Sequence, residues 1–225
     1  MGTVLVTGAA SGLGAAVAQA VLEAGGTPVC LDLRQPELDI PYKIADISET
    51  ANVEEAVAAV AAEHGGIDAV VTAAGTDACG MLLDVPADMW ERVIKVNLIG
   101  TAAVVRAALP HLQDRNGKVV TVASTLGLRA LSDATAYCAS KFGVVGFSRA
   151  LAVEMAGRVG VTLLIPGGMH TAFFDDRDEK YKPPADAKLN RPQDVAAAVV
   201  FALRQPPGCE VREMIITPSM ESSWP

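Results

Sequence analysis

A tyrosine and a lysine in the middle of the chain have a spacing that suits acid–base chemistry. Tyr137 and Lys141 are four residues apart in Tyr-Cys-Ala-Ser-Lys, so on a helix they share one face. A phenol titrates near pH 10, and a lysine ammonium one turn away favours the phenolate and lowers that pKa. Ser124 lies thirteen residues upstream, directly after the apolar run 119–123, which reads as a strand. The pattern predicts a general acid/base held beside a hydroxyl.

A second chemical signal lies at the N-terminus. Gly8, Gly12 and Gly14 form the spacing G-x-x-x-G-x-G between an apolar run at 3–6 and an alanine-rich segment at 15–24. A strand, a glycine turn and a helix N-terminus bind phosphate, because free N–H groups and the positive helix end face the anion. The spacing differs from the commoner G-x-G-x-x-G of dinucleotide folds.

Together these two signals resemble the short-chain dehydrogenase/reductase family, over nearly the whole chain. The resemblance implies hydride transfer between NAD(H) and an alcohol or ketone, with Tyr137 as general acid/base. Lys141 would lower the pKa of Tyr137 and bind the nicotinamide ribose, and Ser124 would position the substrate oxygen. Asn97 matches the family's helix asparagine and would hold a proton-relay water, through its side chain or through its backbone where the helix is disturbed.

Asp32 indicates the choice of dinucleotide. It ends the second strand-like run, eighteen residues after Gly14, where a carboxylate accepts hydrogen bonds from ribose hydroxyls and repels a 2′-phosphate. This favours NAD over NADP. Arg34 is the competing signal, because a nearby arginine can hold that phosphate; we interpret it as a solvated loop charge. Ser11 occupies a position that is often basic in NADP-preferring relatives.

Further cofactor contacts are implied by the resemblance. Asp46 would lie beside the adenine, with a helix cap as the alternative role, and Thr171 would hold the carboxamide. Thr-Ala-Ala-Gly at 72–75 departs from the family's Asn-Asn-Ala-Gly, and His170 is interpreted as a loop residue. The predicted cofactor-binding residues are Gly8, Ser11, Gly12, Leu13, Gly14, Asp32, Asp46, Ile47, Ala74, Gly75, Tyr137, Lys141, Pro166, Gly167 and Thr171.

Strand-like and helix-like runs alternate along the chain. The predicted strands are residues 3–7, 28–32, 42–46, 67–73, 118–123, 161–165 and 213–217, and the predicted helices are residues 14–24, 49–64, 87–109, 135–155 and 192–203. This alternation predicts an α/β, doubly wound, Rossmann-like fold with a mainly parallel seven-stranded sheet. No linker divides residues 1–225, so we expect a single domain. Only thirteen residues separate Asp32 from Asp46, two of them prolines, so no helix is expected there.

Three segments are expected to enclose the substrate: residues 76–83, residues 125–136 and a charged lid at 172–190. Phe173 and Phe174 would be apolar contacts in a lid that opens at low cost. Arg129 could grip a carboxylate, although a surface charge is the simpler interpretation. Trp90 is interpreted as a helix-packing anchor. The substrate itself is not indicated.

Composition restricts the partners. The net charge of −8 argues against nucleic acid, and the chain has no run of about 18 apolar residues, so no membrane contact is expected. Four cysteines without C-x-x-C spacing indicate neither metal nor disulfides, and with no secretory signal the expectation is a cytoplasmic protein. The 51% apolar fraction suggests a homodimer or homotetramer, with residues 222–225 packing on a neighbour. The alternative to an enzyme is a non-catalytic nucleotide-binding sensor or scaffold subunit.

Overall fold

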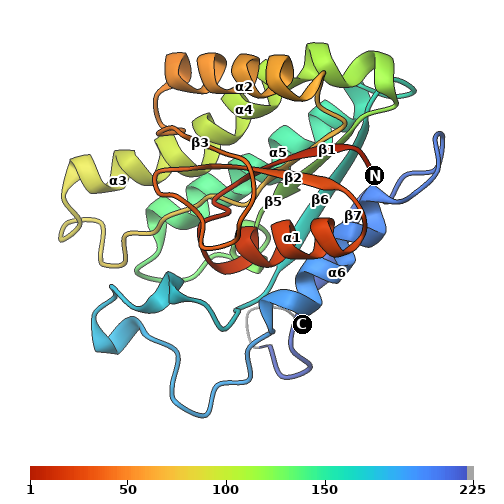
Figure 1. Ribbon diagram of the computed structural model, residues 1–225. Coiled ribbons are helices and arrows are strands. Elements are labelled where there is room, and N and C mark those ends of the chain that lie inside the picture. The colour runs from red at the N-terminus through yellow and green to blue at the C-terminus, as the bar shows by residue number, and fades with distance from the viewer. Residues whose placement is uncertain (222–225) are drawn as a thin grey trace.

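The computed structural model describes residues 1–221. Its centre is a seven-stranded sheet in the order β3-β2-β1-β4-β5-β6-β7, and every neighbouring pair is parallel (Figure 1). The strands are β1 (Thr3–Thr7), β2 (Thr27–Asp32), β3 (Tyr42–Ile44), β4 (Ala69–Thr72), β5 (Lys118–Val122), β6 (Gly160–Pro166) and β7 (Glu213–Ile216). The predicted doubly wound fold is confirmed. Residues 222–225, expected to pack on a neighbour, lie outside the described residues.

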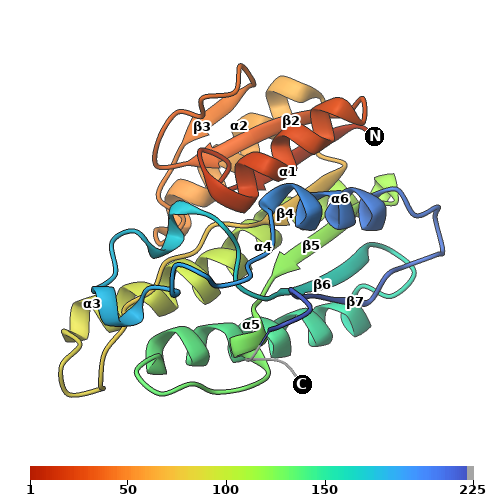
Figure 2. The same ribbon diagram turned by 90° about the horizontal axis from the view of Figure 1, so that it is seen from below.

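Helices cover both faces of the sheet (Figures 1 and 2). Helices α1 (Gly12–Glu23) and α6 (Pro192–Leu203) pack together on one face, and α2 (Thr50–His64), α4 (Thr101–Leu112) and α5 (Thr135–Glu154) cover the other. Strand β1 shows why two layers are required. Val4 and Val6 belong to the core under α1 and α6, whereas Leu5 belongs to the core under α2 and α4. Alternate side chains point to opposite faces, so a continuously apolar strand needs cover on both.

The connection between β2 and β3 contains no helix, as its two prolines predict. The loop nevertheless covers the sheet, because Ile40 is buried and Leu38 partly buried in the same core as Cys30 and Val17. Two apolar side chains here provide part of the cover that a helix would give. The loop also keeps β3 parallel to β2, with Cys30 opposite Tyr42.

The predicted helix at 87–109 is wrong in two details. It is divided into α3 (Ala87–Ile94), a π-helical segment η1 (Lys95–Gly100) and α4, and it continues past Pro110 to Leu112. Pro110 lies in the last turn of α4 and has no N–H to donate to the Arg106 carbonyl, so the helix continues there with one hydrogen bond fewer. The π segment lies where Gly100 meets Ile47: a Cβ on Gly100 would lie 2.7 Å from the Ile47 carbonyl oxygen.

The continuous helical stretch Ala87–Arg115 is long and apolar enough to cross a membrane by length and composition alone. The sequence, which has no uninterrupted run of about 18 apolar residues, does not predict such a helix. Half of its most apolar window is buried within the fold, where α4 packs against α2. That burial is typical of a core helix.

Candidate functional site

The glycine turn between β1 and α1 is a tight backbone cradle. Gly8 has φ 72°, and a Cβ there would lie 2.7 Å from Ala74 Cα; a Cβ on Gly14 would lie 2.2 Å from the Gly8 carbonyl oxygen. Only glycine allows these approaches. Ser11 directly precedes α1, and its side chain makes no capping hydrogen bond. The amides that open α1, at Gly12, Leu13 and Gly14, therefore lie at the positive end of the helix.

Asp32 lies at the end of β2, beside this turn. Its Oδ2 accepts from the Ala10 amide at 3.0 Å, and its Oδ1 accepts from the Arg34 amide at 3.2 Å. The carboxylate is therefore fixed next to the glycine turn, and its recognition of a ribose stays a prediction. The Arg34 residue is exposed, in keeping with a solvated loop charge.

The ends of β3 and β4 supply the next part of the site. Asp46 Oδ1 accepts from the Ser48 amide at 2.9 Å. Partial burial acts to raise the pKa of Asp46, but the hydrogen bonds from Ser48 and the charge of Arg92 together lower it. Asp46 precedes α2 by four residues, so it orders the approach to the helix without being its N-cap. Ile47 is buried against Gly100. The loop after β4 lacks the asparagines of the Asn-Asn-Ala-Gly pattern. It is held instead by Thr7, whose Oγ1 accepts from the Ala74 amide at 3.1 Å.

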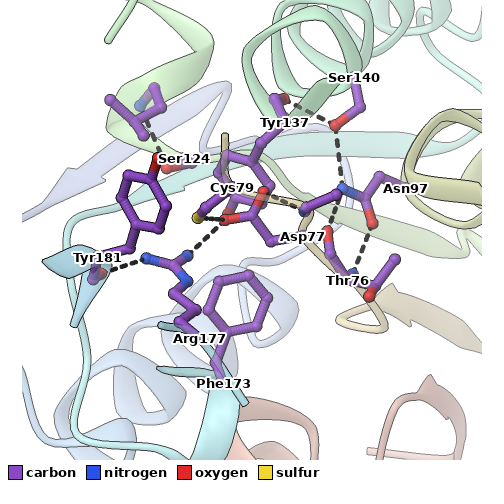
Figure 3. Close-up of polar contacts among 12 residues, drawn as sticks. Thr76, Asp77, Cys79, Asn97, Ser124, Tyr137, Ser140, Phe173, Arg177 and Tyr181 are labelled. Carbon is purple, nitrogen blue, oxygen red and sulfur yellow. Dashed lines mark hydrogen bonds and ion pairs between the residues drawn. The ribbon is translucent and has the colours of Figure 1, made fainter. Parts of the chain in front are cut away.

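The predicted catalytic side chains converge at the carboxyl ends of β4 and β5, and Figure 3 shows three of them, Asn97, Ser124 and Tyr137. Ser124 follows β5, and its hydroxyl lies close enough to Tyr137, on the first turn of α5, to lower the pKa of the phenol. Lys141 is buried and donates from Nζ to the Val122 carbonyl at 2.9 Å. A Cβ on Gly75 would lie 3.8 Å from Lys141 Nζ and 3.4 Å from Asn97 Oδ1, so these three residues meet.

Electrostatics at Tyr137 differ from the sequence expectation. Burial and the Asp77 carboxylate raise its pKa to about 12, while the Ser124 hydroxyl and the Arg177 guanidinium act in the opposite direction. Lys141 is not among the protein groups that shift this pKa, and its predicted effect beside a bound oxidised nicotinamide stays a prediction. Its Nζ is 5.6 Å from the centre of the Tyr137 ring, and burial lowers the lysine's own pKa to about 8. With protein groups alone, Tyr137 is therefore held as a phenol, the form that donates a proton.

Asn97 lies in the π segment, and its side chain is fully used. Oδ1 accepts from the Thr76 amide at 2.8 Å, and Nδ2 donates to the Thr76 carbonyl and to Ser140 Oγ at 2.9 and 3.0 Å. Ser140 in turn donates to the Tyr137 carbonyl. The side chain thus ties the loop after β4 to the helix that carries Tyr137. Of the two roles considered for a water contact, the backbone one is favoured, because the helix is disturbed at this residue.

The loop after β6 returns to the glycine turn. Pro166 and Gly167 are buried, and a Cβ on Gly12 would lie 3.5 Å from Thr171 Cγ2. Thr171 therefore lies against the glycine turn, and its contact with a nicotinamide carboxamide stays a prediction. His170 is exposed and its backbone amide donates to the Asn190 carbonyl, in keeping with a loop role. Trp90 donates to Thr135 Oγ1 and packs α3 on α5, which confirms the packing interpretation.

The three expected substrate walls lie together. A bridge pairs Gly80 with Ala134, which joins the first wall to the second. Arg177 Nη2 lies 2.6 Å from Asp77 Oδ2, which joins the lid to the first wall. Neither Asp77 nor Arg177 is predicted from the sequence to be a functional residue. The two are 100 residues apart, and no spacing pattern links them; the only signal was their location in two predicted walls.

Comparison with known proteins gives consistent matches. The protein-family model described as short chain dehydrogenase matches residues 2–182 of this chain. The chain is 31% identical over 216 residues to a 3-oxoacyl-[acyl-carrier-protein] reductase of Thermotoga maritima, covering 88% of each chain. It is 32% identical over 226 residues to an uncharacterized oxidoreductase of Staphylococcus aureus, covering 95% of this chain and 96% of that one.

Solved structures agree with this. The closed form of a serine dehydrogenase complexed with NADP+ superposes with a TM-score of 0.88 at 26% identity, covering 95% of this chain and 94% of that one. An aldohexose dehydrogenase of Thermoplasma acidophilum superposes with a TM-score of 0.87 at 23% identity, covering 96% and 92%. The second likeness concerns the fold alone.

Proposed function

The chain belongs to the short chain dehydrogenase family of oxidoreductases, and we propose that it transfers hydride between NAD(H) and an alcohol or ketone. One observation carries the proposal. Tyr137, beside Ser124, lies on the helix that also brings Lys141 to Gly75 and Asn97, at the strand ends nearest the glycine turn. Proton transfer at a substrate oxygen and dinucleotide binding can therefore take place side by side.

The residues present fit a dinucleotide. The space at Gly8 and Gly14, which a Cβ would fill, leaves the backbone open to a pyrophosphate at the start of α1. Asp32 would take the adenosine ribose, Ala74, Gly75 and Ile47 would line the adenosine side, and Lys141 and Thr171 would hold the nicotinamide half. When bound, the dinucleotide supplies the hydride acceptor or donor and, in its oxidised form, a positive charge.

The chain's own residues would handle the proton. In ketone reduction, Tyr137 donates its phenolic proton to the substrate oxygen, and Ser124 donates a hydrogen bond that fixes this oxygen. Burial and Asp77 keep Tyr137 protonated, which suits this direction. In alcohol oxidation the phenol must first lose its proton. A water held by the Asn97 backbone and Lys141 would carry this proton away from Tyr137.

Asp32 supports NAD as the preferred dinucleotide. Both of its oxygens are held by backbone amides on the glycine-turn side of β2, so a 2′-phosphate would meet a fixed negative charge. The solved serine dehydrogenase contains NADP+, so members of this fold also take the phosphorylated form. Comparing the Kd values for NADH and NADPH by fluorescence tests the preference directly.

A screen tests the proposed activity. Absorbance at 340 nm follows NAD with a panel of alcohols and NADH with a panel of ketones, each with wild type and Tyr137→Phe. We expect turnover of at least one compound by wild type and a loss of about 10²–10⁴-fold in the variant. Tight NADH binding with no turnover across the panels would favour the alternative, a nucleotide-binding sensor or scaffold subunit.

A further inference from the structure

A partly buried ion pair joins the lid to the loop after β4. Arg177 Nη2 lies 2.6 Å from Asp77 Oδ2, with 19% of the arginine side chain and 7% of the aspartate side chain exposed. Asp77 is itself held in place, because its Oδ1 accepts from the Ala78 amide at 2.7 Å and its Oδ2 accepts from the Cys79 thiol at 3.3 Å. Figure 3 shows this cluster beside Tyr137. A charge pair so far out of water needs its partner, because a lone buried charge is costly.

The same guanidinium organises the aromatic side chains of the lid. Its carbon lies 5.1 Å from the ring centre of Phe173 and 4.6 Å from that of Phe174. The Phe173 ring in turn lies 5.8 Å from the ring of Tyr137. The Phe173 ring therefore lies between Arg177 and the side chain of Tyr137. Asp77 holds the Arg177 end of this arrangement through the ion pair.

The rest of the lid is held mainly at its base. Met169 pairs with Asn190 in an isolated bridge, and the His170 amide donates to the Asn190 carbonyl, which closes the base of the loop. Between these points the lid forms two short 3-10 turns, Ala172–Phe174 and Glu179–Tyr181. Its other ion pair, Lys182 with Glu179, stays within the lid and cannot tie it to the body of the protein.

We propose that Asp77 and Arg177 are positioning residues that latch the lid in its closed position, so that Phe173 covers Tyr137 during the reaction. The role given to the closed site rests on the proposed function. The closure of the lid by this pair does not depend on that function. Opening the lid requires this pair to separate. The pair thereby controls access to Tyr137 and the exclusion of water from it.

The pair also brings two opposite charges to Tyr137. The groups that face the phenol are Asp77 from the loop after β4, Ser124 after β5 and Arg177 from the lid, with Lys141 and Cys138 on its own helix. Asp77 raises the pKa of Tyr137 and Arg177 lowers it. By charge alone, neutralising Asp77 should lower the pKa of Tyr137 and neutralising Arg177 should raise it, whereas opening of the lid in either variant should lower it by reducing burial.

Hydrogen exchange on the protein without substrate tests the latch. The reporter amides are those of Asp175 and Tyr181, which donate to the Ala172 and Asp178 carbonyls at the two turns and belong to neither mutated residue. The variants are Asp77→Asn, Arg177→Met and their double mutant. In Asp77→Asn the side chain keeps an oxygen that accepts from the Ala78 amide. If this variant does not fold, the result for Arg177→Met decides whether the latch exists. Glu179→Gln is the matched control, because it removes an ion pair from the same lid without touching the latch.

We expect exchange at the reporter amides to rise about 10- to 100-fold in each single variant, no further in the double mutant, and less than twofold in Glu179→Gln. Unchanged exchange in Arg177→Met, or effects that multiply in the double mutant, would overturn the latch. No turnover is needed, so inactivity of the wild type would refute the proposed function and leave this result standing.

Once a substrate is found, the pH dependence of kcat/KM for alcohol oxidation gives a second readout. The rate rises with pH as Tyr137 loses its proton. Asp77→Asn removes a charge that raises the pKa of Tyr137 and also opens the lid, so both effects should shift this rise to lower pH. In Arg177→Met the two effects oppose each other, so its shift to lower pH should be smaller than that of Asp77→Asn. No shift in Asp77→Asn, or a larger downward shift in Arg177→Met, would show that the pair does not act on Tyr137 in this way.

Discussion

The sharpest consequence of the glycine turn is that one substitution should have opposite effects at two helical positions. A Cβ on Gly14 would lie 2.2 Å from the Gly8 carbonyl oxygen, 2.5 Å from the Gly8 carbonyl carbon and 2.9 Å from the Ala9 nitrogen. All three atoms belong to the backbone, so none can rotate away. Overpacking of this kind costs about 1–3 kcal/mol, and we take the upper end. Alanine's better helix propensity returns about 1 kcal/mol, which leaves Gly14→Ala less stable by about 2 kcal/mol.

Gly146 provides the matched control. It lies inside α5, and a Cβ there would meet nothing within 4 Å. Gly146→Ala should therefore gain about 0.5–1 kcal/mol from helix propensity alone. For a chain of this size, 1 kcal/mol corresponds to about 2–4 °C in Tm, so Gly14→Ala should melt about 4–8 °C lower and Gly146→Ala slightly higher.

Thermal unfolding and NADH fluorescence titration measure both effects. Gly14→Ala should also weaken NADH binding, because the turn that would cradle the pyrophosphate must move, whereas Gly146→Ala should bind as wild type does. Equal Tm values for the two variants, or unchanged NADH affinity in Gly14→Ala, would refute this account of the turn.

Two further substitutions test neighbouring parts of the site. Asp32→Ala should narrow the gap between the Kd values of NADH and NADPH, because the charge that opposes a 2′-phosphate is gone; a wild type that binds NADPH more tightly would show that Arg34 governs the pocket. Asn97→Leu should lower the free energy of unfolding by about 1–3 kcal/mol, since it removes the partner of the Thr76 amide and carbonyl and one partner of Ser140. Denaturant unfolding measures this, and a change below about 0.5 kcal/mol would contradict the bracing role.

The sequence predicted the fold well because its signals were local. Continuously apolar strands such as Thr3–Thr7 and the alternation with helices indicate a parallel sheet covered on both faces, and the two prolines between β2 and β3 exclude a helix. The π segment at Lys95–Gly100 was not foreseen as a break between two helices. It coincides with the approach of Gly100 to Ile47, a tertiary contact that no helical period reveals.

The site was predictable where it depended on spacing within one element, as with Tyr137 and Lys141. It was not predictable where it depended on contacts between distant loops. Asp77 and Arg177 lie in segments that read only as substrate walls, and their effect on the pKa of Tyr137 follows from the folded geometry. The side chain of Asn97 is another case, because its three partners become visible only when the loop after β4 meets α5. Lid opening stays a prediction.

The most direct test of the proposed function is transfer of the label from NADH deuterated at the transferring C4 position. A ketone found in the screen is incubated with wild type or with Tyr137→Phe, and the alcohol product is analysed by mass spectrometry. The account predicts that the wild-type product carries a single deuterium on the carbinol carbon. Tyr137→Phe should bind NADH normally and form this product about 10²–10⁴ times more slowly. An unlabelled alcohol, or equal rates for the two proteins, would contradict hydride transfer with Tyr137 as the proton donor.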